Sequence, residues 1–303
     1  MSRFEVGQIL WGKISSYTIA VSLRNRPGGP WLAIGPNCER FVVKTGPENR
    51  LQKEAQALRL FRGCGPLRQL VDEVQDPPSL VLEYMDSSVL SLVKKNKLAR
   101  VEAKRALQAA AQALVALHEN GIVHTDVKPD NILARDNAPG GALYKLSDLG
   151  DCSPADVPSN DGNHLIGAEI FCAPEVLLGI PWTAKADIWG LGATGITLIT
   201  RSYIFFPRNP PPPKDPRLSL AVLQIQNDFY GPISRAAFRS LAKDSDLPLL
   251  QQLEESYRPF PLSKASPLVR QEDVEFFGYI MRADPRERPS ASEILRHPWF
   301  DGV

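Results

Sequence analysis

The sequence predicts an α+β fold of two lobes, a small strand-rich lobe followed by a larger helical one. β-branched and aromatic residues gather in short runs over about the first hundred residues, which is typical of strands. After about residue 99, apolar residues instead recur three or four positions apart, which is typical of helices. We expect a single domain over 1–303, with lobes at 1–85 and 86–303 and a functional site in the cleft between them.

The composition is that of an ordinary globular chain. Of the 303 residues, 43% are hydrophobic and 23% charged, which excludes global disorder. The 35 Lys and Arg residues nearly balance the 34 Asp and Glu residues, so nothing indicates binding to nucleic acid. The four cysteines lie far apart without a CxxC pair, which argues against a zinc ribbon or a disulfide framework.

The N-terminal segment lacks the apolar core of a signal peptide, and the most apolar stretch, 188–200, is too short to cross a bilayer. We therefore expect an intracellular protein, in the cytoplasm or nucleus, with no membrane partner. The oligomeric state is left open by the sequence.

The first lobe reads as strands that flank one helix. Strands are predicted over 17–23 and 40–44, with the turn-forming segment 25–30 between them, and a third strand is predicted over 80–84. A helix is predicted over 48–62, where Leu51, Ala55 and Leu58 share one face, and it stops at Gly63-Cys-Gly-Pro66. In the second lobe, helices are predicted over 101–118, 186–200, 218–228 and 272–282.

The most informative segment is His124-Thr-Asp-Val-Lys-Pro-Asp-Asn131, which follows the helix over 101–118 and a short strand. In a tight loop, Asp126 can accept a hydroxyl proton, Lys128 can neutralise phosphate charge and Asn131 can ligate a divalent metal. Further on, Tyr144-Lys-Leu-Ser-Asp-Leu-Gly150 places Asp148 at the end of a strand, where its carboxylate can hold magnesium.

These segments resemble the eukaryotic protein kinases, whose catalytic loop reads HRDxxxxN, whose metal loop reads DFG and whose activation segment ends in APE. Here the corresponding residues are HTDVKPDN, DLG and Ala173-Pro-Glu175. The resemblance implies the bilobal kinase fold and four supporting residues. His124 belongs to the catalytic-loop motif, Asp187 supports the backbone of that loop, and Glu175 pairs with Arg288.

In the first lobe, Phe41-Val-Val-Lys44 is similar to the kinase motif VAIK. The resemblance implies that Lys44 holds the α and β phosphates of ATP and that Glu54 supports Lys44. The separation of these two residues is short for the family, and Glu48 is a weaker alternative partner.

Leu82-Glu-Tyr-Met85 resembles the kinase gatekeeper and hinge. The resemblance implies that Leu82 is the gatekeeper and that backbone groups of Glu83 and Met85 bind adenine. The apolar walls around the base are assigned to three further residues, Val21, Val42 and Leu133.

Two further features depart from the family pattern. The expected GxGxxG loop keeps only Gly12, within Ile9-Leu-Trp-Gly-Lys-Ile-Ser-Ser16, so a weaker grip on phosphate is expected. Thr125 replaces the arginine of HRD, which argues against activation by phosphorylation of the usual type. The HTDVKPDNIL and DLG segments look most like SR-protein kinases and their short fungal-type relatives, but Cys172 and the missing long insert give no reason to assume Arg-Ser substrates.

The leading hypothesis is a serine/threonine protein kinase that uses ATP and Mg²⁺ to phosphorylate a protein substrate. Asp126 is the catalytic base, Asn131 and Asp148 are the magnesium ligands, and Lys128 indicates the serine/threonine branch. One competing hypothesis is a pseudokinase scaffold that binds nucleotide weakly or not at all, which the degraded glycine loop favours. A small-molecule phosphotransferase ranks last, because it would not require Ala173-Pro-Glu175 or Arg288.

Overall fold

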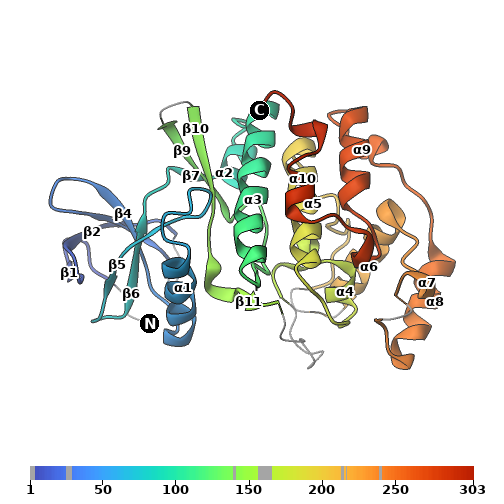
Figure 1. Ribbon diagram of the computed structural model, residues 1–303, viewed down its shortest axis with the longest axis horizontal. Helices are drawn as coiled ribbons and strands as arrows, with labels where there is room; N and C mark the ends of the chain where they lie inside the picture. The colour runs from blue at the N-terminus through green and yellow to red at the C-terminus, as the bar shows by residue number, and fades with distance from the viewer. Residues whose placement is uncertain are drawn as a thin grey trace. The chain divides into compact units, whose positions relative to one another are not determined.

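The computed structural model describes residues 4–24, 29–138, 141–155, 166–212, 215, 217–238 and 241–303. It divides the chain into two compact units (Figure 1). The first unit consists of Met1–Ser87 with Leu133–Cys152, and the second consists of Ser88–Ile132 with Ser153–Val303. The first is rich in strands and the second is mainly helical, which confirms the predicted α+β class. The segment 133–152 clusters with the first unit, and the lobe limits at 85 and 86 stay a prediction.

The first unit is built on a six-stranded antiparallel sheet. The strands are β1 (Ile9–Trp11), β2 (Ser16–Ser22), β3 (Trp31–Ile34), β4 (Arg40–Lys44), β5 (Leu70–Val74) and β6 (Ser79–Glu83). Their order across the sheet is β1-β2-β3-β4-β6-β5 (Figure 1). The sequence predicted β2, β4 and β6 and missed the other three strands. Of the predicted turn over 25–30, residues 25–28 lie outside the described residues.

The two faces of this sheet carry different sets of side chains, because successive side chains of a strand point to opposite faces. One face carries the main apolar cluster of the unit, formed by Phe4, Leu10, Tyr17, Ile19, Ala33, Val43, Val74 and Val81. On the other face, the register aligns Val21, Leu32, Val42 and Leu82 as successive cross-strand partners. Lys44 lies on this second face, two positions after Val42 on β4.

Helix α1 (Glu48–Leu60) presents a buried stripe that includes Leu51, Glu54, Ala55 and Leu58. The helix follows Pro47 and ends at Leu60, with Phe61 as its C-cap, and Gly63 then adopts a positive φ of 81°. The predicted helix over 48–62 is therefore confirmed to within two residues. Its apolar periodicity explains why Glu54, three positions after Leu51, lies on the buried side of the helix.

A second, three-stranded sheet has the order β10-β9-β7. Its strands are β7 (Ser87–Ser88), β9 (Ile132–Ala138) and β10 (Gly141–Leu146). Strand β10 leads directly to Asp148 and to a short 3-10 helix, η1 (Leu149–Asp151). This sheet therefore sets the position at which the metal-loop motif begins.

The second unit contains α2 (Val89–Lys94), α3 (Arg100–Glu119), α4 (Pro174–Leu177), α5 (Lys185–Thr200), α6 (Arg217–Tyr230), α7 (Arg235–Phe238), α8 (Leu247–Ser256), α9 (Gln271–Ile280) and α10 (Ala291–Ile294). Two short strands, β8 (Ile122–Val123) and β11 (Ser153–Pro154), pair with each other. The remaining 3-10 helices are η2 (Glu169–Phe171), η3 (Asp244–Asp246), η4 (Leu262–Lys264), η5 (Pro285–Glu287) and η6 (Pro298–Phe300).

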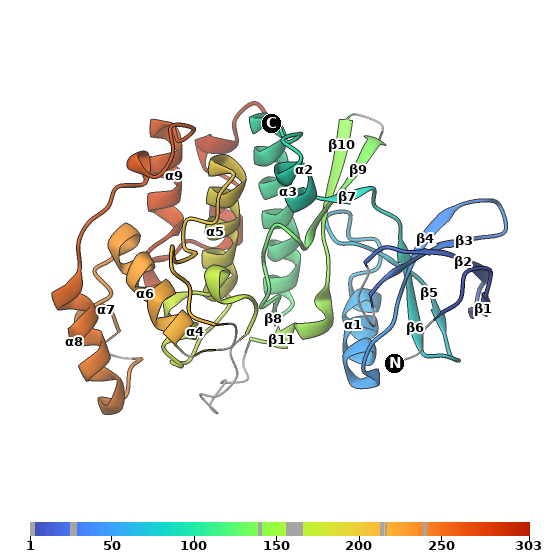
Figure 2. The ribbon, with the colours of Figure 1, turned by 180° about the vertical axis from the view of Figure 1, so that it is seen from behind.

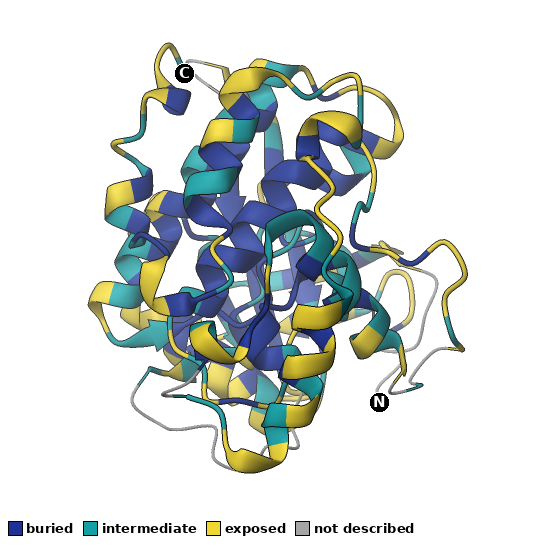
Figure 3. Cartoon of the chain, turned by 90° about the vertical axis from the view of Figure 1, so that its right-hand side faces the viewer, coloured by how far each residue is buried: buried dark blue, intermediate teal, exposed yellow. Residues whose placement is uncertain are grey.

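Helix α5 is the centre of the second unit. Nearly all of its residues are buried, and it lies beside α3 and α9 (Figure 2). Gly195 permits this close packing, because a Cβ there would lie 2.7 Å from Phe277 and 2.8 Å from Leu107. In the view toward the helical unit, buried residues gather in the interior and exposed residues around it (Figure 3). Among the described residues, no helix combines the length and the apolar character that crossing a bilayer requires.

Candidate active site

A cluster of one cation and two carboxylates lies in the first unit. Lys44 Nζ is 2.9 Å from Glu54 Oε1, 2.7 Å from Glu54 Oε2 and 2.6 Å from Asp148 Oδ1. Burial raises the pKa of Glu54 above its ordinary value, and the nearby Lys44 ammonium acts in the opposite direction. The predicted Lys44–Glu54 pair is therefore present, whereas Glu48 accepts a hydrogen bond from Gln52 instead.

The metal loop is held against α1. Asp148 adopts a left-handed backbone conformation with φ 68°, and Gly150 approaches the helix so closely that a Cβ would lie 2.8 Å from Arg50 Nε. Arg50 Nη2 is 2.6 Å from Asp151 Oδ2 and 3.6 Å from Asp148 Oδ1. Sequence reasoning missed Arg50, although its position four residues before Glu54, on the same helix face, was a usable signal.

The hinge residue Glu83 is enclosed by polar partners in the same unit. Its carboxylate accepts hydrogen bonds from Lys145 Nζ at 2.7 Å and from the Gln69 amide at 2.8 Å. Its backbone oxygen accepts two hydrogen bonds from Arg68, from Nε at 3.0 Å and from Nη2 at 2.9 Å. The backbone group predicted to bind adenine therefore already has a ligand within the protein, which the sequence did not reveal.

The predicted apolar walls occupy different environments. Val42 and Leu82 are buried cross-strand partners, and Val21 belongs to the same row but is 48% exposed. Leu32, which the sequence analysis missed, stands between Val21 and Val42 in this row. Met85 is buried and Leu133, in β9, is partly exposed. Contacts of these residues with a base stay predictions.

The turn between β1 and β2, where a phosphate-binding loop was predicted, is occupied by a carboxylate. Asp72 accepts hydrogen bonds from the amides of Lys13, Ile14 and Ser15 at 3.0–3.1 Å and from the Tyr17 hydroxyl at 3.0 Å. A Cβ at Gly12 would lie 2.1 Å from Asp72 Oδ2, so the glycine is needed for this contact. The role of Gly12 at a nucleotide phosphate stays a prediction.

The pKa of Asp72 reflects this enclosure. Burial alone would raise the pKa of the carboxyl group, but the hydrogen bonds from the Ile14, Glu73 and Ser15 amides and from Tyr17 hold it below its ordinary value. Burial and the hydrogen bond with Asp72 raise the pKa of the Tyr17 phenol well above its usual range. Asp72 is therefore a charged anchor for the first hairpin.

The catalytic-loop residues converge in the second unit. Asp126 Oδ2 lies 2.5 Å from Lys128 Nζ and accepts a hydrogen bond from Asn131 Nδ2 at 2.9 Å. Asn131 Nδ2 also donates to the Asp126 backbone oxygen at 2.8 Å, which fixes the loop upon itself. Asp126 Oδ1 is buried and has no hydrogen-bond partner among the described residues. Asp126 Oδ1 can therefore accept a hydrogen bond from a ligand.

Asp187, at the start of α5, supports this loop as predicted. Its oxygens accept hydrogen bonds from the amides of His124 at 2.7 Å and Thr125 at 2.8 Å, and His118 Nε2 lies 2.9 Å from Oδ2. Thr125 has φ 70°, an unfavourable conformation for a β-branched residue. The contacts with Asp187 hold this strained backbone just before Asp126.

The predicted pair of Glu175 and Arg288 is present and fully enclosed. Arg288 Nη1 and Nη2 lie 2.6 Å and 2.7 Å from the two carboxylate oxygens, and both side chains are 0% exposed. The remaining donors of Arg288 reach the backbone oxygens of Arg282, Ala283 and Lys185. The pair therefore ties α4 to the segment around η5.

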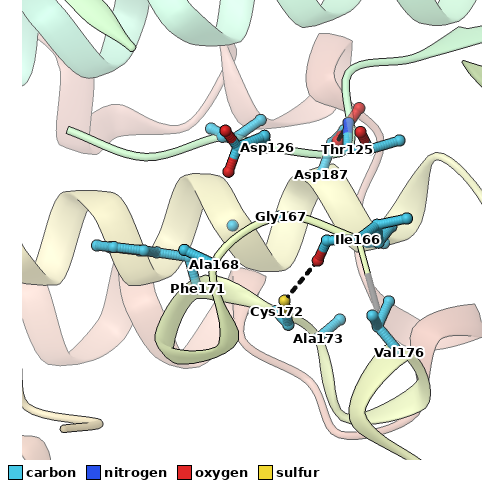
Figure 4. A pocket seen from close by; sticks show the side chains of 13 residues that line it. Thr125, Asp126, Ile166, Gly167, Ala168, Phe171, Cys172, Ala173, Val176 and Asp187 are labelled. Atoms are coloured by element: carbon cyan, nitrogen blue, oxygen red, sulfur yellow. Dashed lines mark hydrogen bonds between the residues drawn. The ribbon is translucent and has the colours of Figure 1, made fainter. Parts of the chain in front are cut away.

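A small pocket in the second unit lies beside the catalytic loop (Figure 4). Asp126 faces it from one side, while Gly167 and Cys172 of the activation segment line the other side. Cys172 Sγ donates to the Ile166 backbone oxygen at 2.8 Å. Burial and the nearby Asp126 raise the pKa of the Cys172 thiol well above its usual range, so the thiol stays protonated. Residues 156–165 of the predicted activation segment lie outside the described residues.

The donor set fits magnesium better than a metal held by protein alone. The described residues contain no group of three or more His, Cys, Asp or Glu side chains that could hold an ion. Mg²⁺ typically uses one or two carboxylates together with phosphate oxygens and water, and Asp148 in the first unit and Asn131 in the second each carry a hard oxygen of this kind. Their role as magnesium ligands stays a prediction. Lys44 offsets part of the negative charge in the cluster that contains Asp148.

The fold and these two sets of residues define a protein of the kinase class, and comparison with known families agrees. The family model described as protein kinase domain matches residues 40–300, which is most of the chain. The chain therefore belongs to the protein kinase family.

Curated relatives are protein kinases from several organisms. The chain is 25% identical over 274 residues to the MAP kinase kinase MKK1/SSP32 of Saccharomyces cerevisiae, which covers 86% of this chain and 47% of that protein. It is 28% identical over 301 residues to a probable serine/threonine-protein kinase of Dictyostelium discoideum, at 95% and 52% coverage. It is 31% identical over 228 residues to the serine/threonine-protein kinase TAO3 of Rattus norvegicus, at 73% and 20% coverage.

The chain thus spans about half the length of the first two relatives. None of the three is described as an SR-protein kinase, so the narrower resemblance inferred from HTDVKPDNIL and DLG is not confirmed.

Proposed function

We propose that this chain is a serine/threonine protein kinase that transfers the γ-phosphoryl group of ATP to a hydroxyl group of a protein. The observation that carries the proposal is the state of Asp126. One oxygen is held by Lys128 and Asn131, while the other is buried without a partner among the described residues. A buried acceptor with no donor is costly unless a ligand supplies one. A substrate hydroxyl supplies that donor.

The chemistry assigns one task to each residue. The substrate hydroxyl oxygen attacks the γ-phosphorus, and the bond from this phosphorus to the β–γ bridging oxygen breaks, so that ADP leaves with the electron pair. Asp126 Oδ1 orients the hydroxyl group and accepts its proton. Lys128, 2.5 Å from Asp126 Oδ2, stabilises charge on the transferred group. The Thr125 backbone, held by Asp187, keeps this geometry in place.

In the first unit, Lys44 is proposed to bind the α and β phosphates, supported by Glu54. Asp148 in the first unit and Asn131 in the second are proposed as the protein ligands that would hold Mg²⁺, which would neutralise charge on the phosphates. Lys44 stands on the fourth strand of the sheet, whereas the kinase lysine stands on the third strand of its lobe. Counting back from Lys44, the strand that leads into the phosphate-covering loop of a kinase corresponds to β2 rather than to β1, so the turn with Gly12 is not the proposed phosphate loop.

Serine/threonine specificity is supported by Lys128 and by the names of the relatives, two of which are serine/threonine-protein kinases. The second candidate, a pseudokinase scaffold, is favoured by one observation: Arg68 occupies the hinge oxygen predicted to bind adenine. The intact set of Asp126, Lys128 and Asn131 argues for the enzyme.

Radiolabel transfer from Mg-ATP to a basic protein substrate tests the proposal. Asp126→Asn should abolish transfer and leave nucleotide binding unchanged, because Asp126 contacts the hydroxyl and not the nucleotide. Asp244→Asn is the control, since it removes an exposed carboxylate of the same unit and should transfer at the wild-type rate. Equal transfer by Asp126→Asn and the wild type would refute the assigned base.

A further inference from the structure

Arg68 makes an unusual contact for a residue near a predicted nucleotide site. Its Nε and Nη2 groups lie 3.0 Å and 2.9 Å from the backbone oxygen of Glu83, within hydrogen-bond range for both. A carbonyl oxygen has two lone pairs, so these two donors use its full accepting capacity. Glu83 is the residue whose backbone the hinge motif assigns to adenine.

The backbone around Arg68 fixes this contact. The Arg68 amide donates to the Leu146 oxygen at 2.9 Å, and the Leu146 amide donates to the Pro66 oxygen at 2.8 Å. One position on, the Glu83 amide donates to the Gln69 oxygen at 3.1 Å, where β5 and β6 run side by side. Arg68 therefore starts from an anchored position next to the hinge, and its side chain reaches Glu83 from within the same unit.

Burial lowers the pKa of the Arg68 guanidinium to about 10, with Glu83, Glu54 and Asp148 as opposing charges, so Arg68 is still a cation at neutral pH. A guanidinium has donors only, as does the 6-amino group of adenine toward an acceptor. Arg68 and that amino group thus compete for the same oxygen, and they cannot both be satisfied by it.

We propose that Arg68 is a specificity-determining residue for the nucleotide, because it occupies the Glu83 oxygen and removes the advantage of a 6-amino group on the purine. This inference rests on the proposed use of a purine nucleotide by the chain. In the wild type, a purine without the 6-amino group binds about as well as adenine. Replacing Arg68 frees the oxygen and makes the 6-amino group favourable.

An electrostatic role for Arg68 predicts a different effect on nucleotide affinity. If Arg68 acted mainly by attracting phosphate or balancing Glu54 and Asp148, its removal would weaken binding of every nucleoside triphosphate alike. Comparing two nucleotides with identical phosphates separates the roles, because only the contact at position 6 of the base differs. The affinity ratio, rather than either affinity alone, reports on Arg68.

The experiment titrates the full chain with Mg-ATP and with the Mg complex of purine riboside triphosphate, which carries hydrogen in place of the 6-amino group. The wild type should bind both with an affinity ratio near one. Arg68→Met should favour ATP by about 3- to 10-fold, the value of one hydrogen bond. Arg62→Met is the matched control, since it removes an exposed arginine of the same connection and should keep the wild-type ratio.

Several results would overturn the proposal. They are a wild type that already favours ATP severalfold, an Arg68→Met variant with an unchanged ratio, or no nucleotide binding by either protein. Should Arg68→Met fail to fold, Arg68→Leu provides the same readout, since leucine also has no hydrogen-bond donor. Because binding is measured without phosphoryl transfer, these outcomes are distinct from a failure of Asp126 as the base.

Discussion

Two buried glutamates, one in each unit, form ion pairs with different surroundings. Glu175 and Arg288 are both 0% exposed, and each guanidinium donor of Arg288 reaches an oxygen of the second unit. Glu54 is also buried, but the side chain of its partner Lys44 is 22% exposed and is shared with Asp148. The ion pair of the second unit is therefore closed, meaning fully buried, whereas that of the first unit is open, meaning partly exposed to solvent.

The difference indicates what each pair does. A closed pair with satisfied donors has no capacity for a ligand, and its loss leaves a buried charge. An open pair keeps a cation accessible between two carboxylates, an arrangement that phosphate and a divalent ion can enter. We therefore propose that the Glu175–Arg288 pair serves stability and that the Lys44–Glu54–Asp148 cluster serves nucleotide binding.

The largest expected effect follows from opening the closed pair. Glu175→Ala leaves Arg288 unpaired at a site without water access and should lower the free energy of unfolding by about 3–5 kcal/mol. Urea denaturation of the second unit measures this loss. Arg217→Ala is the control, since it removes a cation from the exposed pair with Asp215 and should leave the urea midpoint unchanged. A Glu175→Ala midpoint equal to that of the wild type would contradict the structural role.

A middle-sized effect is expected for Asp72, an anchor within the same unit as the open cluster. Asp72→Asn weakens four hydrogen bonds to the first hairpin and should lower the free energy of unfolding by about 1–3 kcal/mol. Nucleotide affinity should stay unchanged, because the turn with Gly12 is not the proposed phosphate loop. A selective loss of Mg-ATP affinity would instead restore that turn as the phosphate site.

The difference in stability between the wild type and Asp72→Asn should change with pH in a defined direction. The pKa of Asp72 lies below its ordinary value of 3.8, so its contribution is fully present above that value and is lost as the pH falls through the folded-state pKa. The gap in melting temperature between wild type and Asp72→Asn should be constant above about pH 5 and should narrow in stronger acid. A gap that widens on acidification would contradict the depressed pKa.

The smallest expected effect concerns Glu54. Its pKa is raised above 4.5, so folding favours the protonated form, and the wild type should lose some stability as the pH rises from 4.5 through the folded-state pKa. Glu54→Gln has no such proton to lose and should lack this decline. Melting temperatures of both proteins across this range provide the test. Parallel curves would show that Lys44 fully compensates the burial of Glu54.

The sequence predicted the local features well. Apolar periodicity located α1, α3 and α5 to within two residues. Short motifs singled out Lys44, Asp126 and Asp148, whose roles stay predictions. These signals lie within a few residues of each other in the chain. The Lys44–Glu54 and Glu175–Arg288 pairs were predictable only through the family resemblance, since the partners lie on different elements, 10 and 113 positions apart.

Other features depend on contacts that no local pattern encodes. The strands β1 and β3 are three and four residues long, too short for a clear alternation. Asp72 reaches the first hairpin from β5, 57–59 positions away, and Arg68 reaches Glu83 across 15 positions. Neither residue belongs to a recognisable motif. From the sequence alone, each would be interpreted as an ordinary solvent-exposed charge. In the folded chain, Asp72 anchors the first hairpin and Arg68 binds the backbone oxygen of Glu83.

The most direct test of the contrast measures two properties of two variants side by side. Lys44→Met and Glu175→Ala are each assayed for the stabilisation that Mg-ATP adds and for the free energy of unfolding without nucleotide. We predict that Lys44→Met loses the Mg-ATP stabilisation and keeps most of its unfolding free energy, because Glu54 can take up a proton. Glu175→Ala should show the reverse. Unchanged Mg-ATP stabilisation in Lys44→Met would contradict the assignment of the open cluster to nucleotide binding.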